Sequence, residues 1–342
     1  MKSSSQSLLL ATLGLTTKTA NAWGSLGHQT VAYLAQHYVS NTTAHWAQAI
    51  LNDTSASYLA NIATWADSYR YTAEGEFSAS FHYIDALDTP PTSCNVDYER
   101  DCPPEGCIVS AIANYTRRVS SPAELDALQV NYALRWIVHF SGDIAQPLHV
   151  ENYEIGGNGV AVTFDGNETN LHAVWDTYIP EKMRGGYGLD KAKEWAEDLA
   201  DEITKGEFKD VAKGWLEGID VNDPVGTSMA WARDGNSYVC SVVMPDGGEV
   251  LEGKELYPEY YESATATVQQ QVAKAGYRLA AYLDAIVETQ AGAPSCYRRG
   301  VHAEMKKRDL SGRDFLPKTQ GLTTVQRARL GKRDDMGCGC MH

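Results

Sequence analysis

Two pairs of histidine and aspartate have the spacing that places metal ligands on one face of a helix. His139 and Asp143 stand four residues apart at the end of an apolar run, and His172 and Asp176 repeat the arrangement. On a helix, residues i and i+4 point in the same direction. A proline then ends or bends the first helix, which separates His149 from the first pair. Two pairs and a further histidine exceed the four ligands that usually hold one zinc ion.

More candidate ligands lie at the predicted mature N-terminus. Cleavage after residue 22 leaves Trp23 first, and a free α-amino group has a pKa of about 7.7–8.0, low enough for a metal to displace its proton. The amine and carbonyl of Trp23 then chelate one ion. His28 reaches the same ion if Gly24 and Gly27 let the chain curl. The alternative is that Trp23 is a core aromatic residue and His28 only begins a helix.

Asp67 and His82 are the remaining candidate ligands. Each stands beside aromatic residues in the body of the chain. A single aspartate or histidine is usually an ordinary polar residue, so each gains weight only from the other ligand sets. Histidine and aspartate without thiolate suit a hydrolytic zinc site, which keeps positions open for water, better than a closed structural site.

The first 22 residues have the features of a secretory signal peptide. Lys2 precedes an apolar run, and Ala20-Asn21-Ala22 is a small-residue cleavage site. The run is too short to span a bilayer, and no other segment has a transmembrane length of apolar residues. We therefore expect an exported, soluble protein without a membrane anchor. Sequons of the type Asn-x-Ser/Thr agree with export and predict glycosylation. They begin at Asn41, Asn52, Asn114 and Asn167.

The cysteines also fit an oxidising compartment. Four lie in the body of the chain, without zinc-ribbon spacing, and are predicted to form disulfides for which three pairings are possible. These are Cys94, Cys102, Cys107 and Cys240. Three more, Cys296, Cys338 and Cys340, lie in the C-terminal tail.

Charge is unevenly distributed along the chain. The net charge is −15, but from Pro294 onward eleven Lys/Arg stand against five Asp/Glu, so the preceding chain carries −21. An acidic body argues against binding nucleic acid, because affinity for phosphates comes mostly from Lys and Arg, unless bound divalent cations reverse the sign locally. Residues 292–342 lack periodicity, which predicts a disordered or removable tail. The dibasic runs Lys306-Lys307-Arg308 and Lys332-Arg333 predict processing there.

Amphipathic patterns predict an all-α domain over residues 23–291. In six segments the apolar residues recur every three to four positions. These segments are 28–38, 57–70, 108–119, 124–144, 189–204 and 258–288. Residues 160–164, between two glycine-containing turns, predict a small β-hairpin. We therefore expect a single helical domain with one hairpin.

Six motifs, in this order, resemble the S1/P1 nuclease family of fungal secreted zinc nucleases, which shares its fold with zinc phospholipase C. The resemblance covers roughly residues 23–291. The motifs are Trp23-Gly24-x-x-Gly27-His28, Trp65-Ala66-Asp67, His82-x-Ile84-Asp85, His139 and Asp143 with Gln146-Pro147-Leu148-His149, Gly156-Gly157-Asn158, and Asn170-Leu171-His172 with Trp175-Asp176.

The resemblance implies a cleft that holds three zinc ions. The implied ligands of the first ion are Asp67, His82, His139 and Asp143. Asp143 is implied to bridge to a second ion, held also by the Trp23 amine and carbonyl and by His28. The implied ligands of the third ion are His149, His172 and Asp176. The implied disulfides are Cys94–Cys240 and Cys102–Cys107.

The resemblance also implies a nucleotide pocket. Tyr83 is implied to stack on the base, Asp85 to bind the base edge, and Arg70 and Asn158 to lie near the phosphate; Asp67, Arg70 and Asn158 are the implied catalytic residues. Two positions depart from the family pattern. Position 83 is commonly Phe, and an acidic residue is usual where Val150 stands. Because Tyr also stacks, we expect altered preference and retained activity.

We therefore expect a secreted, monomeric endonuclease that hydrolyses single-stranded DNA and RNA to 5′-phosphorylated products, with 3′-nucleotidase activity on 3′-mononucleotides. An unstacked base is needed for stacking on an exposed aromatic ring, which favours single strands. A zinc phospholipase C is the nearest enzymatic alternative, but its site should lack the pocket of Tyr83 and Asp85. A secreted zinc-binding protein without catalytic activity is the alternative from another class.

Overall fold

The computed structural model describes residues 23–122 and 125–291. The predicted signal peptide and the predicted basic tail lie outside these residues, as do Cys296, Cys338 and Cys340. Within the described part of the chain, helices dominate, and none of them is long and apolar enough to cross a bilayer. The prediction of an all-α fold with a small hairpin is confirmed.

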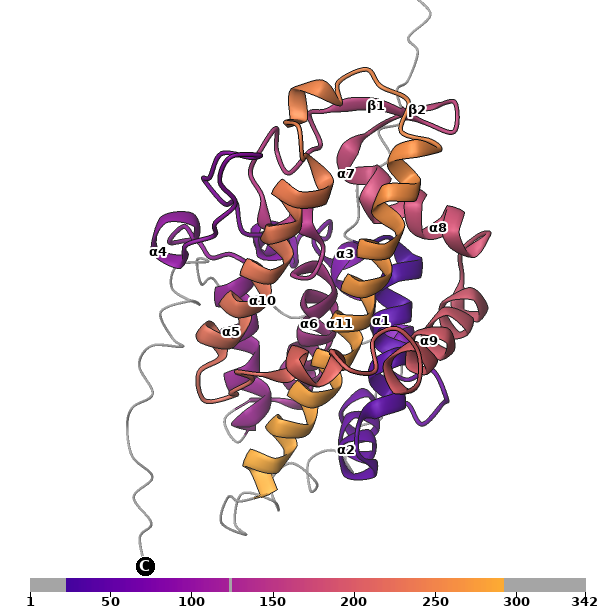
Figure 1. Cartoon of the computed structure of the whole chain (residues 1–342). Helices are drawn as coiled ribbons and strands as arrows, with labels where there is room; N and C mark the ends of the chain where they lie inside the picture. Colours follow the sequence, from indigo (N-terminus) through magenta and orange to yellow (C-terminus); the bar gives the residue numbers. More distant parts are fainter. Residues whose placement is uncertain (1–22, 123–124, 292–342) are drawn as a thin grey trace, which may run out of the picture.

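Helices α6 (Ala127–Asp143) and α11 (Glu259–Ala291) run through the middle of the molecule (Figure 1). Helix α1 (Ser25–Tyr38) packs against α11, and α5 (Ile108–Ser120) packs against α6. Gly276 of α11 permits the close approach of α1, because a Cβ there would lie only 2.7 Å from the Cβ of Leu34. The central helices therefore place α1 and α6, which carry candidate ligands, on neighbouring paths.

The other helical elements pack around this centre. In chain order they are α2 (Asn41–Leu51), η1 (Ala60–Ile62), α3 (Trp65–Tyr69), η2 (Glu76–His82), α4 (Tyr98–Asp101), η4 (Pro147–Val150), α7 (Leu171–Ala173), η5 (Val174–Tyr178), α8 (Ile179–Arg184), α9 (Leu189–Thr204), η6 (Ala212–Leu216), α10 (Pro224–Tyr238), η7 (Val239–Val243) and η8 (Gly248–Val250).

Five of the six predicted helical segments are single helices in the structure, and one is not. The segment 57–70 is broken into η1 and α3 with a turn between them. The carbonyl of Ala63, in that turn, accepts a hydrogen bond from the ring of His139. The break therefore places a backbone acceptor at the site. Helices α2 and α10 were not among the predicted segments.

Aromatic packing holds α6 against its neighbours on the side that carries the site. The ring of Trp136 stacks on Tyr115 of α5, at 5.5 Å, and on Phe140, at 5.0 Å. Trp65 of α3 meets Trp136 edge to face at 5.0 Å. Each such pair adds about 0.5–1.5 kcal/mol beyond its buried area. The end of α6 is thus held rigidly with respect to α3 and α5.

The predicted hairpin is confirmed. Strand β1 (Ala161–Phe164) pairs antiparallel with β2 (Asn167–Asn170), with Val162 opposite Thr169. The two turn residues, Asp165 and Gly166, have φ of 51° and 77°, as the two-residue turn that matches strand twist requires. The hairpin leads directly into α7, which carries His172.

Both disulfides implied by the resemblance are present. Cys94–Cys240 ties the loop before α4 to the turn η7 that follows α10, and Cys102–Cys107 closes the tip of the loop just before α5. The asparagines of three sequons, Asn41, Asn52 and Asn167, are exposed. Asn114 is half-buried on α5, and the hydroxyl of Thr116 in the same sequon is buried against Tyr282. Glycosylation at all four positions stays a prediction.

Candidate metal centre

The end of α6 carries the first candidate pair. Asp126 begins this helix by accepting a hydrogen bond from the backbone N–H of Gln129, and the last two turns are buried on every side. The helical spacing brings His139 Nε2 to 3.3 Å from Asp143 Oδ2. The prediction that these two side chains point at one spot is correct.

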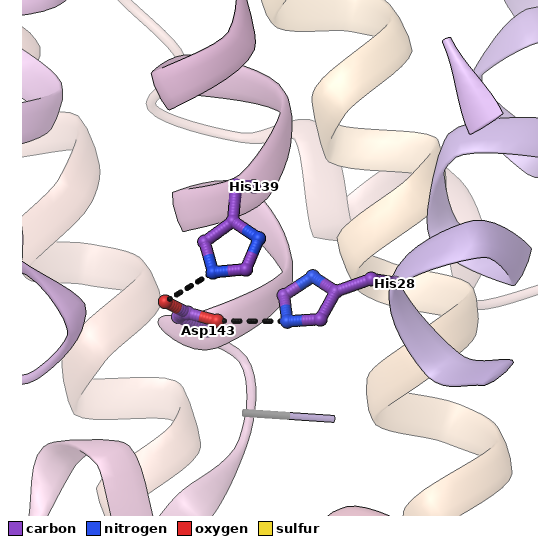
Figure 2. A group of neighbouring side chains, drawn as sticks. All are labelled: His28, His139 and Asp143. Atoms are coloured by element: carbon purple, nitrogen blue, oxygen red, sulfur yellow. Dashed lines mark ion pairs between the residues drawn. The ribbon is translucent and has the colours of Figure 1, made fainter. Parts of the chain in front are cut away.

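Asp143 lies between three histidines that come from three different elements (Figure 2 shows two of them). Its Oδ1 is 3.0 Å from Nε2 of His28 on α1, and its Oδ2 is 2.9 Å from Nδ1 of His82 in η2. The rings of His28 and His139 are stacked 4.0 Å apart. One carboxylate therefore faces His28 with one oxygen and His82 and His139 with the other, which is the arrangement of a bridging ligand.

Asp67 closes the group on the other side of His82 and His139. Its Oδ1 is 3.6 Å from Nε2 of His139 and 3.9 Å from Nδ1 of His82. The two ring nitrogens are themselves 3.1 Å apart. One ligand atom from each of these three residues lies within 4.8 Å of the others, which is close enough for a single ion.

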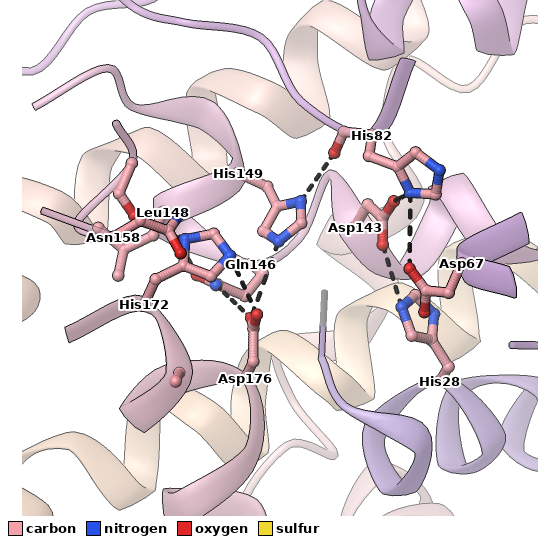
Figure 3. Close-up of polar contacts among 12 residues, drawn as sticks. His28, Asp67, His82, Asp143, Gln146, Leu148, His149, Asn158, His172 and Asp176 are labelled. Atoms are coloured by element: carbon pink, nitrogen blue, oxygen red, sulfur yellow. Dashed lines mark hydrogen bonds and ion pairs between the residues drawn. The ribbon is translucent and has the colours of Figure 1, made fainter. Parts of the chain in front are cut away.

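A further ligand group is formed by His149, His172 and Asp176 (Figure 3). Asp176 Oδ2 is 3.0 Å from Nε2 of His172, and Oδ1 is 3.8 Å from Nε2 of His149. The segment His172–Asp176 changes from α7 into the π-helical turn η5 between the two residues. The prediction that His149 is separated from His139 and joins the second pair is consistent with this geometry.

Backbone carbonyls fix the rings of three of these histidines. Nδ1 of His139 donates to the carbonyl of Ala63 at 2.6 Å, and Nδ1 of His149 donates to the carbonyl of His82 at 2.7 Å. Nδ1 of His172 donates to Gly156 at 2.6 Å. Since a carbonyl only accepts, each Nδ1 carries a proton, which leaves Nε2 as the nitrogen that a metal ion could bind. Such contacts are typical of metal-binding histidines.

The unpaired polar atoms of the site fit metal ions. Nε2 of His28, Nε2 of His149, Oδ1 of Asp67, Oδ1 of Asp143 and Oδ2 of Asp176 are all buried without a hydrogen bond. Oδ1 of Asp143 approaches His28 closely, but without hydrogen-bond geometry. Leaving such groups unpaired costs about 1–3 kcal/mol each, and more when they are charged. A cation at each group would satisfy them.

The pKa values of the site residues also fit metal ions. Burial lowers the pKa of His28, and it lowers the pKa of His82 to about 4, so both rings are neutral at physiological pH, as metal ligands must be. Burial opposes a charge on His139, yet Asp143 and Asp67 together raise its pKa to about 9. The surrounding carboxylates thus favour a positive charge at this point. Asp176 remains ionised, because its histidines lower its pKa to about 2 despite burial.

Two glycines allow the close packing on which the site depends, and the sequence argument gave neither of them this role. A Cβ at Gly142 would lie 2.7 Å from Nδ1 of His28, so α1 and α6 approach at this point because position 142 has no side chain. Gly156 has φ of 58° and belongs to a left-handed turn with Glu154 and Ile155. Its carbonyl holds His172. Their positions in the chain, one residue before Asp143 and in Gly156-Gly157-Asn158, were the available signals.

Trp23 is fully buried next to His28. Its carbonyl accepts a hydrogen bond from the backbone N–H of His28 at 3.3 Å. Gly24 packs against the end of the third group, since a Cβ there would lie 3.1 Å from the carbonyl oxygen of Asp176. The start of the described chain therefore lies between His28 and Asp176, which belong to two different ligand groups.

The candidate substrate residues flank the ligand groups. Arg70 lies 3.8 Å from Asp67, and it lowers the pKa of Tyr83, which burial and Asp85 raise more strongly. Tyr83 is 38% exposed, while Asp85 is half-buried. Asn158 is exposed on the loop that holds His172 (Figure 3), at the opposite end of the view from Asp67. The structure thus brings Arg70, Tyr83 and Asp85 to one end of the site and Asn158 to the other.

A fourth acidic group is not a metal site. Asp88, Cys94 and Glu151 lie within 4.8 Å of one another, but Cys94 is bonded to Cys240 and has no thiolate to offer. Glu151 is buried, and one of its oxygens accepts the backbone N–H groups of Asn152 and Tyr153. Burial and the neighbouring Asp88 raise its pKa to about 8. Glu151 therefore holds a proton at neutral pH in the folded protein.

We expect Glu151→Gln to remove one source of pH dependence from stability. Because its pKa is raised on folding, Glu151 contributes to the free energy of unfolding fully below pH 4.5. This contribution is lost as pH rises towards 8, by at most about 1.4 kcal/mol per pH unit. Glutamine is neutral throughout. Melting temperatures of the variant and the wild type should converge at acidic pH, and the variant should melt higher near pH 8. Parallel pH profiles would contradict the assignment.

Comparison with known proteins places these ligand groups in a family. The model of the S1/P1 nuclease family matches residues 23–288. Nuclease P1 of Penicillium citrinum is 54% identical over 264 residues, which cover 77% of this chain and 97% of that protein. Nuclease S1 of Aspergillus oryzae is 52% identical over 277 residues, covering 81% and 95%. Endonuclease 3 of Arabidopsis thaliana is 30% identical over 273 residues, covering 78% and 90%.

The match extends over every element that carries a candidate ligand, from Trp23, just before α1, to Asp176 in η5. The ligand groups found in the structure are able to bind metal ions, in agreement with a metal-dependent enzyme family. Because the shared region also spans nearly the whole length of nucleases P1 and S1, the chain belongs to the S1/P1 nuclease family and is a hydrolase of phosphodiester bonds.

Proposed function

We propose that this nuclease is a secreted, monomeric enzyme that uses three zinc ions to cut single-stranded DNA and RNA into 5′-phosphorylated products and to remove the phosphate of 3′-mononucleotides. The observation that carries the proposal is the position of Asp143 between His28, His82 and His139, with a separate group of ligands nearby. Two-ion sites of this kind recur in enzymes that hydrolyse phosphate esters.

The proposed ligands follow the three groups. The first ion would be held by Asp67, His82, His139 and Asp143. The second would be held by Asp143, His28 and the amine and carbonyl of Trp23. The third would be held by His149, His172 and Asp176. When bound, zinc supplies Lewis acidity, which lowers the pKa of water and neutralises negative charge on phosphate oxygens. Three such ions add a charge of +6 to an acidic protein that must meet a polyanion.

The chain's own residues bind and orient the nucleotide. Arg70, close to the carboxylate of Asp67, presents its guanidinium to the phosphate. Asp67 thereby connects the proposed ligands of the first ion to the residue that binds the phosphate. Asn158 offers an exposed side-chain amide on the far side of the site. Asp85 is half-buried beside Tyr83, where its carboxylate can accept hydrogen bonds from a base edge.

Tyr83 accounts for the preference for single strands. Its backbone is held firmly, because its carbonyl accepts the N–H of Ile108 and both neighbouring residues bond to His149. Its ring is 38% exposed at the edge of the site. A base reaches such a ring only when it leaves the stack of a duplex. The position next to His82 then brings the phosphate of the stacked nucleotide to the ligand groups.

We expect Tyr83→Ala to lower kcat/KM for short single-stranded oligonucleotides. The loss should correspond to about 1–3 kcal/mol of transition-state stabilisation, the usual value of one base stack. Zinc content should not change, because Tyr83 is not one of the proposed ligands. Tyr83→Phe is the matched control and should retain most of the activity, because it keeps the stacking face. Equal kcat/KM for Tyr83→Ala and wild type would exclude Tyr83 as the stacking residue.

Activity on three substrates tests the proposal as a whole. Purified mature protein should degrade single-stranded DNA and RNA, lose that activity in a chelator, recover it with zinc, and contain close to three zinc ions per chain. It should leave phosphatidylcholine vesicles intact. Lipid hydrolysis without nuclease activity would favour a phospholipase. Three bound zinc ions without any hydrolysis would favour a zinc-binding protein.

A further inference from the structure

Gln146 connects the two segments that carry the ligands of the third group (Figure 3). It is fully buried between the end of α6 and the turn η4. Its Nε2 donates to Oδ1 of Asp176 at 2.6 Å, and its Oε1 accepts the backbone N–H of Leu148 at 2.6 Å. One side chain therefore begins the turn that carries His149 and also holds the carboxylate of Asp176.

The turn itself fixes the orientation of the amide. Pro147 has no N–H, so the N–H of Leu148 is the first donor of η4 that needs an acceptor. Only the oxygen of the Gln146 amide can accept it, which leaves the NH₂ group facing Asp176. The direction of the amide is thus determined by the backbone and does not depend on the metal.

This contact determines which oxygen of Asp176 is available. Oδ1 already accepts a hydrogen bond from Gln146, whereas Oδ2, 3.0 Å from Nε2 of His172, is buried without one. A carboxylate held by one oxygen cannot rotate freely, so Oδ2 stays directed at the ligand group. A neutral amide also leaves the negative charge of Asp176 uncompensated for a cation. A lysine or arginine in its place would compete with that cation.

We propose that Gln146 is a positioning residue that sets the affinity of the third metal site by holding Asp176 and His149 in one geometry. This inference rests on the proposed function, because it concerns the third of the proposed zinc ions. Partners that orient metal ligands typically change metal affinity 10- to 100-fold when they are replaced. Within the described residues, the side chain of Gln146 shows no hydrogen bond to the nucleotide pocket residues or to the group around Asp143; only its backbone N–H reaches that group, at the carbonyl of Asp143.

Two substitutions separate the two bonds of Gln146. Gln146→Glu keeps the shape and the acceptor for Leu148, but at neutral pH it replaces the donor with a carboxylate facing Asp176. Gln146→Met keeps the volume and removes both bonds. We expect one of three zinc equivalents to be released at a chelator concentration about 10- to 100-fold lower in both variants, with the larger change for Gln146→Glu. The release should be followed with a zinc-sensitive dye, together with circular dichroism to verify that the protein stays folded.

Asn131→Leu is the matched control. Asn131 is an equally buried amide on α6, and it donates to the carbonyl of Ile50, away from every ligand group. This variant should lower the melting temperature without changing zinc release. If it weakens the same zinc equivalent as Gln146→Glu does, general destabilisation explains the effect and the proposal is wrong.

A double variant identifies the ion concerned. His172→Ala should remove the same zinc equivalent, so Gln146→Glu combined with His172→Ala should lose nothing further. Additive loss of a second equivalent would overturn the assignment to the third site. A wild-type protein that binds three zinc ions and a Gln146→Glu variant with the same release curve would refute the role of Gln146 alone. A wild type that binds only two ions, both unaffected by His172→Ala, would refute the proposed trinuclear centre as well.

Discussion

Asp143→Ala is expected to abolish nuclease activity and to leave the protein with fewer than three zinc ions. The carboxylate faces His28 with one oxygen and His82 and His139 with the other, so its loss affects two proposed metal sites at once. Burial and charge make the effect severe. Asp143 is fully buried, and its histidine neighbours keep its pKa well below the usual value although burial opposes this.

Stability should fall together with metal content. Removing one partner of a buried charged cluster typically costs about 3–5 kcal/mol. The matched control is Asp234→Ala on α10, which removes the carboxylate that pairs with Lys274 and Arg278 of α11. That variant should also melt earlier, but it should keep three zinc ions when folded. Zinc analysis and denaturant unfolding of both variants separate the effects. Near-normal turnover with three zinc ions in Asp143→Ala would disprove the bridging role.

The sequence predicted the helices whose apolar faces are regular. The boundaries predicted for 189–204 agree with α9, and those predicted for 258–288 differ from α11 by one residue at the start and three at the end. Helix α10 was missed because Gly, Ser and Thr interrupt its apolar face, although Asp223 caps it and Pro224 begins it. Helix α2 was missed because it is short and begins with polar residues. Apolar periodicity finds a helix only where one face is continuously apolar.

The identity of the candidate ligands was more predictable than their geometry. Types and spacing were enough to pair His139 with Asp143 and His172 with Asp176, because a helix fixes the direction of residues i and i+4. The approach of His28 to Asp143 depends on how two helices pack across Gly142, and no local pattern encodes that. The carbonyl that orients His139 comes from a break at Ala63 in a segment predicted to be continuous.

Contacts through the backbone also join the ligand groups in a way that spacing does not show. The carbonyl of His82 accepts Nδ1 of His149, so a residue of the first group orients a residue of the third. The carbonyl of His149 in turn accepts the N–H of Ile84, on the other side of Tyr83. Tyr83 is therefore held between two bonds to one histidine. The nucleotide pocket and the third group share a single rigid segment.

The second large effect is expected at the N-terminus: protein that carries even one extra residue before Trp23 should bind about one zinc ion fewer and be nearly inactive. The α-amine of Trp23, if free, has a pKa of about 7.7–8.0 and yields its proton to a metal. An extended chain offers an amide nitrogen at the same place, which is a poor ligand at neutral pH. Trp23 is fully buried and its carbonyl bonds to the N–H of His28, so the nitrogen lies within a packed segment.

A removable extension provides the matched control. The same protein should be made with a short N-terminal extension whose protease site ends immediately before Trp23, and measured before and after cleavage. Before cleavage, the fold should be intact, since neither disulfide involves this segment, while zinc content should be about two and turnover close to background. Cleavage in the presence of zinc should restore the third equivalent and the activity together. Full zinc content and full activity in the uncleaved protein would show that the nitrogen of Trp23 is not a ligand. In that case His28, Asp143 and the carbonyl of Trp23 would be the proposed ligands left for the second ion, and the close packing of Gly27 against Trp23 would reflect only the burial of an aromatic side chain.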